Sequence, residues 1–417
     1  MTTADHSTVQ RRTLSLLFVT QVTGGVGVAV GVSVGALLAA ELAGTGVSGL
    51  AQSSVVLGGA LLALPATTIV RRSGRRLSLT VAYVVAALGA MLIVGAAVRS
   101  SLALLFSGYL LFGAATAATM QARFAAVDLS PPALRGRHLS IIVWATTLGA
   151  VLGPNLAAFA GAAVAGYGVP ALAGPFVFSA ALFVLAAIVL TLLMRPDPAV
   201  LARETVAADA TASARKHGGL REAFGVITSD ASARLGMIAM AVGNMVMVGV
   251  MAMTPVHIRG AGHDAPHTLR IVGIVISFHI AGMYALSPVV GWLTDRFGRR
   301  PVIMMGLVCL IAACALTGTA GYGTVRLAAG LMLLGFGWSC TMVAGSTLLT
   351  ESVPAEMRAS TQGASDFAMG IAGATAGDLS GVVVAALSYP TLTLLASLVA
   401  LPVMVLVARP PGPHGST

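Results

Sequence analysis

The sequence predicts an all-α membrane protein whose twelve transmembrane helices form two pseudo-symmetric six-helix bundles. Three observations predict this fold. Of the 417 residues, 57% are hydrophobic and only 9% are charged, whereas a soluble domain needs roughly a quarter of its residues charged. Apolar stretches long enough to cross a bilayer recur along the chain, and two charged motifs of the first half return in the second half.

The first half contains enough apolar sequence for six crossings, each of which requires about 20 mostly apolar residues. The fifth and sixth helices share an uncharged stretch from Leu139 to Met194, and Gly166–Pro170 supplies the turn between them. The four preceding windows are Thr13 to Ala40, Leu42 to Val70, Leu77 to Val98, and Ser100 to Ala122.

The second half repeats this count. Its last two helices share the stretch from Ala359 to Ala408, which turns near Ser388–Pro390. The four preceding windows are Leu235 to Ile258, Ile271 to Thr294, Pro301 to Val325, and Leu327 to Thr350. We therefore expect bundles at residues 1–194 and 234–417, joined by a polar cytoplasmic linker at 195–233 with a short surface helix around Leu220 to Ile227.

Basic residues predict the orientation, because cytoplasmic loops carry the excess of Lys and Arg. Only four of the 24 basic residues fall in loops on the outer side, and both termini are expected to be cytoplasmic. This pattern predicts a multi-pass protein of the plasma (inner) membrane.

The net charge of +10 is scattered between apolar runs, which excludes a nucleic-acid-binding stripe. The expected partners are the lipid bilayer and a small-molecule or metal-ion substrate, and we expect a monomer.

Two charged motifs recur at nearly one offset, which indicates an internal duplication. A Gly-Arg-Arg run follows the second helix at Gly74–Arg76 and the eighth at Gly298–Arg300, 224 residues later. An acid, six residues and an arginine follow the fourth and tenth helices, 223 residues apart. These acid–arginine pairs are Asp128 with Arg135 and Glu351 with Arg358. Duplicated transporter folds bind substrate near the midplane, between the repeats.

The segment Gly291-Trp-Leu-Thr-Asp295-Arg296-Phe-Gly298-Arg299-Arg300 resembles the loop 8–9 signature of the major facilitator superfamily. The resemblance implies alternating access with a cytoplasmic gate. A plain positive-inside anchor would explain the arginines but not Asp295. The first half has Arg71 at the matching position, so we expect the stronger latch in the second half. The expected gating residues are Gly291, Asp295, Arg296, Gly298, Arg299, Arg300, Asp128, Arg135, Glu351 and Arg358.

The fifth helix carries Gly149, Gly153 and Pro154, a pattern that is similar to a motif of the superfamily's drug:proton antiporters. Glycines four residues apart permit close helix contact, which any transporter with moving bundles can use. Asp366 and Asp378 lie inside the eleventh helix, 12 residues apart. Ionisable residues within a membrane segment are functional candidates by default, so both are candidates for proton coupling.

Helices seven and eight carry an unusual set of soft side chains. Met247 and Met251 lie four residues apart and share a helical face, and His279 and Met283 repeat that spacing on the next helix. Thioether and imidazole ligands suit copper(I). Methionine is otherwise an ordinary core residue, and a membrane histidine can simply join two helices by a hydrogen bond.

The Met-x3-Met and His-x3-Met pattern resembles that of the CcoA-like transporters. The resemblance implies copper import through these four residues, and related branches carry other small solutes such as riboflavin. In the loop between the two helices, four polar residues could collect a metal ion or form an ordinary polar loop. They are His257, His263, Asp264 and His267.

The sequence therefore predicts a secondary active transporter that imports copper(I) or another small solute by alternating access, with no permanently bound cofactor. One alternative is a proton-coupled efflux antiporter of drugs or metabolites. A second alternative is a membrane assembly factor or sensor that transports nothing. An enzyme is not expected, because the sequence offers no nucleophile–base set and no phosphate-binding loop.

Overall fold

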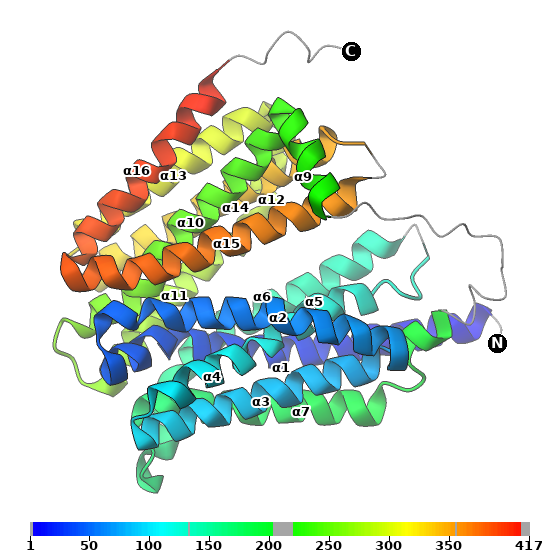
Figure 1. Cartoon of the computed structure of the whole chain (residues 1–417), viewed down its shortest axis with the longest axis horizontal. Coiled ribbons are helices and arrows are strands. Elements are labelled where there is room, and N and C mark those ends of the chain that lie inside the picture. The colour runs from blue at the N-terminus through cyan, green and yellow to red at the C-terminus, as the bar shows by residue number, and fades with distance from the viewer. Residues whose placement is uncertain (1–2, 132–133, 203–219, 355–356, 410–417) are drawn as a thin grey trace. The chain divides into compact units, whose positions relative to one another are not determined.

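Helices make up the regular structure of the described residues, 3–131, 134–202, 220–354 and 357–409, in the computed structural model of the chain (Figure 1). Twelve helical segments in this part of the chain are long and apolar enough to cross a membrane. Each of the eight single windows largely overlaps one of these segments, and each of the two long stretches covers two of them. This agreement confirms the predicted all-α membrane fold.

The contacts of the chain divide it into two compact units, each with a short segment from the other half of the sequence. Unit 1 comprises residues 1–44, 50–214 and 262–273, and unit 2 comprises residues 45–49, 215–261 and 274–417. Unit 1 contains α1 (Thr3–Ala43), α3 (Arg75–Arg99), α4 (Leu102–Phe112), α5 (Ala114–Ala125), α6 (Arg135–Val164), the turns η3 (Ala165–Tyr167) and η4 (Ala171–Ala173), and α7 (Gly174–Leu193), with nearly all of α2 (Gly49–Ser73).

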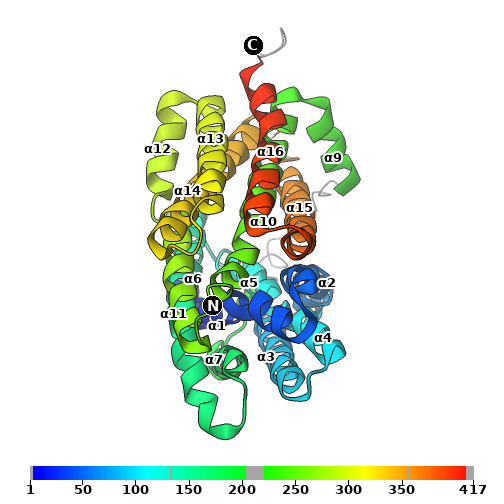
Figure 2. The same ribbon diagram turned by 90° about the vertical axis from the view of Figure 1, so that its left-hand side faces the viewer.

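Unit 2 begins with the predicted surface helix, α9 (Leu220–Ser229), whose Ala223 and Ile227 are fully buried. Its other helices are α10 (Ala231–Arg259), the larger part of α11 (Ala265–Tyr284), α12 (Ser287–Phe297), α13 (Arg299–Gly318), α14 (Thr324–Glu351), α15 (Arg358–Ala386) and α16 (Tyr389–Ala408), together with the turn η1 (Thr45–Val47). Figure 2 shows α13, α16 and α10 running along one another in this unit.

Residues 45–49 belong to unit 2 and residues 262–273 to unit 1, and each segment packs closely on the backbone of a helix in its unit. A Cβ atom on Gly49, beside η1, would collide with the Gly377 carbonyl on α15. A Cβ on Gly273 of α11 would lie 2.7 Å from the Pro154 carbonyl oxygen on α6. Glycine at both positions therefore allows a segment from one half of the sequence to pack directly on a helix of the other half.

Two of the predicted crossings are interrupted near their middle, which the apolar windows do not reveal. The fourth crossing consists of α4 and α5, which meet at Gly113, where a Cβ atom would collide with the backbone of α2. The eighth crossing consists of α11 and α12, and Pro288 occupies the first turn of α12. Proline has no N–H, so Pro288 cannot donate a helical hydrogen bond to the carbonyl of Tyr284, the last residue of α11. This missing bond accounts for the second interruption.

Candidate functional site

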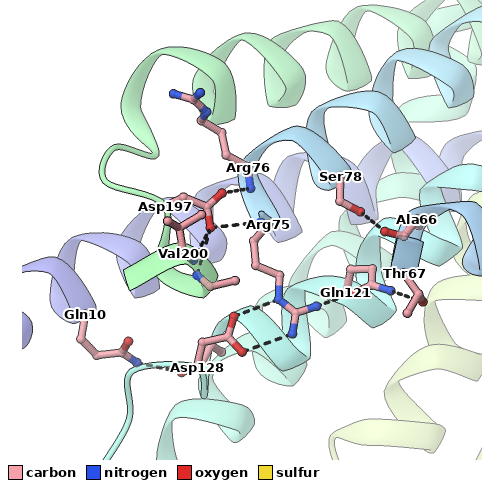
Figure 3. A network of polar contacts seen from close by, with 12 residues as sticks. Gln10, Ala66, Thr67, Arg75, Arg76, Ser78, Gln121, Asp128, Asp197 and Val200 are labelled. Carbon is pink, nitrogen blue, oxygen red and sulfur yellow. Dashed lines mark hydrogen bonds and ion pairs between the residues drawn. The ribbon is translucent and has the colours of Figure 1, made fainter. Parts of the chain in front are cut away.

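The Gly-Arg-Arg run of the first half forms a buried polar network at the start of α3 (Figure 3). Arg75 donates from Nε and Nη2 to the two carboxylate oxygens of Asp128, at 2.9 and 3.2 Å. Its Nη1 donates to Gln121 Oε1 at 2.5 Å. The Arg75 and Asp128 side chains are only 13% and 17% exposed. One residue from each of the two repeated motifs, Arg75 and Asp128, therefore forms this ion pair.

A carboxylate from beyond α7 caps the same helix. Asp197 accepts hydrogen bonds from the backbone N–H groups of Arg75 and Arg76, at 3.1 and 2.8 Å. Gly74 precedes them with φ of 93°, and a Cβ atom there would collide with the Asp197 carboxylate. A negative charge at a helix N-terminus is favourable, so Asp197 fastens the start of the linker to α3.

The second half repeats the ion pair but leaves it more open to solvent. Arg299 donates from Nε and Nη2 to Glu351, at 2.9 and 2.6 Å, and the two side chains are 28% and 51% exposed. Gly298 repeats the unusual φ of Gly74, with a value of 90°. Of the two ion pairs, the first-half pair is the less exposed and carries an additional hydrogen bond to Gln121. Whether the second half holds the stronger gate stays a prediction.

Among the described residues, only Asp295 of the remaining predicted gating residues is linked to the second-half pair. Asp295 and Arg296 are exposed at the end of α12, and the Asp295 charge acts on the Arg299 guanidinium. Gly291 faces open space. Arg300 donates from Nη1 to the Arg409 carbonyl at 2.7 Å. Arg358, the first residue of α15, is exposed, and Arg135 is the first residue of α6, with a side chain that lies outside the described part of the structure.

The glycines of the fifth crossing lie on the face of α6 that meets α1. A Cβ atom on Gly149 would lie 2.6 Å from the Val22 carbonyl oxygen, and one on Gly153 would lie 2.9 Å from the Val26 carbonyl oxygen. Pro154 is accommodated inside α6. Whether this contact serves antiport stays a prediction.

The predicted copper ligands occupy two helices that both contact α14. His279 is fully buried, and its Nδ1 lies 2.8 Å from the Leu331 carbonyl oxygen. Met283, one turn later, packs beside Gly335. Met247 is 6% exposed and Met251 is half-buried on α10. Among the hydrogen bonds, ion pairs and ring contacts of the described residues, none joins these four side chains into one site.

The imidazole of His279 nevertheless has one unused nitrogen. Its Nε2 is buried and has no hydrogen-bond partner among the described residues. Since a carbonyl only accepts, Nδ1 must be the protonated nitrogen, and Nε2 then carries a free lone pair. A metal-binding histidine is commonly held in this way by a backbone carbonyl.

A cluster that the sequence analysis missed joins α10, α11 and α14. Trp338 donates from Nε1 to Asn244 Oδ1 at 3.1 Å, and Asn244 donates from Nδ2 to the Met369 carbonyl at 2.9 Å. The Tyr284 ring meets the Trp338 ring edge to face, with centroids 6.1 Å apart. All three side chains are half-buried. The sequence signal that could have indicated this cluster is the presence of an asparagine and a tryptophan within apolar windows.

The two acids of the eleventh crossing differ in their surroundings. Asp366 is exposed and accepts a hydrogen bond from Gln362 at 3.1 Å. Asp378 is half-buried, and its Oδ1 has no hydrogen-bond partner in the described part of the chain. Whether either acid takes part in proton coupling stays a prediction.

The four polar residues between helices seven and eight do not form one metal site. His257 lies within α10, stacked between Tyr322 and Tyr389 with centroids 5.0 and 4.3 Å away, and its Nε2 lies 2.7 Å from the Gly321 carbonyl. His263 and His267 are exposed, with ring centroids 4.6 Å apart. The described residues contain no group of three or more His, Cys, Asp or Glu that could hold a metal ion, so the interpretation as an ordinary polar loop is preferred.

Comparison with known proteins matches nearly the whole chain to one protein family. The model of the Major Facilitator Superfamily matches residues 14–271 and 266–417. The chain is 39% identical over 409 residues to the uncharacterized MFS-type transporter YdeG of Bacillus subtilis (strain 168), covering 96% of this chain and 93% of the relative. It is 28% identical over 368 residues to the riboflavin transporter RfnT of Brucella anthropi, covering 87% and 86%.

Solved structures support the same fold at low identity. The nucleoside transporter NupG matches with a TM-score of 0.75 at 16% identity, over 96% of this chain and 100% of that chain. A D-xylose–proton symporter matches with a TM-score of 0.71 at 18% identity, over 96% and 98%. At these identities the similarity establishes the fold alone.

Proposed function

The chain belongs to the major facilitator superfamily, a family of transporters and not enzymes, and on that premise we propose that it carries a small planar heteroaromatic solute by alternating access. The observation that carries this substrate class is the hydrogen bond between Trp338 and Asn244. As a secondary transporter it moves a small solute through the membrane.

Depth in the bilayer supports this assignment. Asn244 lies in the middle of α10, and Trp338 lies in the middle of α14. Tyr284 ends α11 near the middle of the interrupted eighth crossing, Ala265–Phe297. Transporters with internal repeats bind their substrates near the midplane, so the cluster lies at the depth where a substrate is expected.

The chemistry of the cluster suits a flat solute with hydrogen-bonding edges. A half-buried indole ring offers an apolar face for stacking, which is worth about 1 kcal/mol beyond the area it buries. The Asn244 amide has donors and an acceptor and is already oriented by Trp338 and the Met369 carbonyl. The similarity to RfnT, whose name describes it as a riboflavin transporter, supports a solute of this class.

We expect Trp338→Ala to lower the transport of such a solute by about tenfold or more, because both the stacking surface and the partner of Asn244 are removed. Trp338→Phe keeps an aromatic face and should retain part of the activity. The measurement is uptake of radiolabelled riboflavin, and of nucleobase-like solutes as further probes, into proteoliposomes that contain the purified chain.

Trp144→Ala provides a matched control, because Trp144 is 63% exposed on α6. This variant should transport the solute at the wild-type rate. Wild-type-level uptake by Trp338→Ala would contradict the assignment of the cluster. If the protein carries none of these solutes above the rate of empty liposomes, the substrate class is wrong.

Copper(I) is the second candidate, and the free Nε2 of buried His279 favours it. Met283 follows one turn later on the same helix, so the two side chains share a face. Neutral nitrogen and sulfur ligands are those that copper(I) prefers. Met247 and Met251 would complete the ligand set from α10.

If copper is the substrate, His279→Phe should reduce copper uptake by cells about tenfold or more, because the nitrogen ligand is lost while an aromatic ring of similar size remains. The control is His267→Phe, since His267 is exposed. Copper accumulation in cells with and without the protein is the measurement, and equal accumulation in the two would dismiss copper import. Trp338→Ala should spare copper uptake, which separates the two candidates.

Proton-coupled efflux is the remaining transport alternative, and the unpartnered Asp378 Oδ1 is the observation that favours it. In that case Asp378→Asn should abolish substrate-driven proton movement. An assembly factor or sensor would show no flux of any solute in the same liposomes.

A further inference from the structure

Three arginines surround a cavity at one end of unit 2. The cavity has a volume of about 190 Å³. Arg234 lies in the first turn of α10, Arg300 is the second residue of α13, and Arg409 follows the end of α16. No acidic side chain is among the described residues that line it, so no lining residue offsets the positive charge of the three arginines.

The guanidinium groups retain most of their hydrogen-bonding capacity. Each has five N–H donors. Arg234 uses Nη1 on the Thr228 carbonyl at 2.9 Å, and Arg300 uses Nη1 on the Arg409 carbonyl at 2.7 Å. Arginine binds phosphate oxygens through pairs of parallel N–H donors, so the mouth of the cavity has the chemistry of a phosphate site.

The wall between the arginines is apolar. Leu235 and Ile238 line it from α10, and Leu406 lines it from α16 with 38% of its surface exposed. All three belong to segments long and apolar enough to cross the membrane. The cavity therefore passes from a cationic end at the membrane surface to a hydrocarbon-like wall within the bilayer.

We propose that this cavity binds an anionic phospholipid of the leaflet on the side of the C-terminus, which the distribution of basic residues predicts to be cytoplasmic. The phosphodiester contacts Arg234, Arg300 and Arg409, and an acyl chain lies along the apolar wall. Basic pockets between transmembrane helices at the cytoplasmic surface recognise anionic headgroups. A soluble phosphate has the same headgroup chemistry but makes no use of the leucine and isoleucine side chains.

The test uses the full chain, purified in an uncharged detergent and freed of lipid, and native mass spectrometry with three probes: phosphatidylglycerol, phosphatidylcholine and inorganic phosphate. We expect the wild type to bind phosphatidylglycerol about tenfold more tightly than the other two. The double variant Arg234→Gln/Arg409→Gln should lose about tenfold or more of that affinity, because charge-assisted hydrogen bonds are removed.

Two variants control for folding and for general charge. Arg234→Lys/Arg409→Lys keeps the positive charge and should retain most of the binding. Arg72→Gln removes one exposed positive charge from the end of α2 and should bind as the wild type does. Wild-type affinity in the double glutamine variant, or phosphatidylcholine binding as tight as phosphatidylglycerol, would overturn the proposal. Tight binding of inorganic phosphate alone would assign the cavity to a soluble anion.

Discussion

Replacing Gly149 with leucine is expected to separate α6 from α1 and to destabilise the first bundle severely. The Cβ atom of any larger residue would lie 2.6 Å from the Val22 carbonyl oxygen, 2.7 Å from the Val26 nitrogen and 2.8 Å from the Gly25 carbonyl carbon. All three are backbone atoms, so no side-chain rotation can relieve the collision. Overpacking of a core typically costs 1–3 kcal/mol, and we expect about 3 kcal/mol or more here.

Thermal unfolding of the detergent-solubilised protein, followed by size-exclusion chromatography, measures this effect. Gly95→Leu is the matched control, because Gly95 lies in α3 and its Cβ position has no atom within 4 Å. The control should unfold close to the wild-type temperature. Close packing of α1 against α6 would be refuted if Gly149→Leu were as stable as Gly95→Leu.

Arg75→Ala should be the second most damaging change, and it should destabilise the protein more than Arg299→Ala does. Removing one partner of a largely buried, charge-assisted pair costs about 1.5–3 kcal/mol, because the other charge loses its hydrogen bonds. Asp128 is only 17% exposed, and the Oε1 atom of Gln121 would also lose its donor. Glu351 is 51% exposed, so the loss of Arg299 should cost about 1 kcal/mol or less.

The comparison requires unfolding temperatures of both variants and of Arg72→Ala, which removes an exposed arginine at the end of α2. The exchanged pair Arg75→Asp/Asp128→Arg should recover part of the lost stability, since the charges again attract. Equal losses for Arg75→Ala and Arg299→Ala would show that burial does not set the strength of the two pairs.

Much of the fold could be predicted from the sequence because membrane insertion is governed by local composition. About 20 apolar residues must cross the bilayer as a helix, so hydropathy alone located the twelve crossings. The interruption at Gly113 could not be predicted, because it lies where the chain packs so closely on α2, a helix distant in sequence, that a Cβ atom would not fit. Hydropathy contains no information about which helices touch.

The candidate site was harder to predict for the same reason. The duplication drew attention to both charged motifs, but only the structure shows that Arg75 pairs with Asp128 and Arg299 with Glu351. Asn244 and Trp338 are 94 residues apart, and neither belongs to a motif. Their proximity depends on the crossing of α10 and α14, which no spacing rule supplies.

The capping carboxylate of Asp197 bears on how duplicated genes diverge. The first half has Arg71 where the second has Asp295, and a position-by-position comparison would score that loop as degenerate. Yet a carboxylate still binds the start of α3, contributed from 122 residues downstream. In the second half, Asp295 acts on Arg299 through its charge from the end of α12, so the carboxylates near the two corresponding helix starts come from different places in the chain. A comparison of two diverged halves should therefore consider which charges lie near each helix end in the structure, and not only which residues align in the sequence.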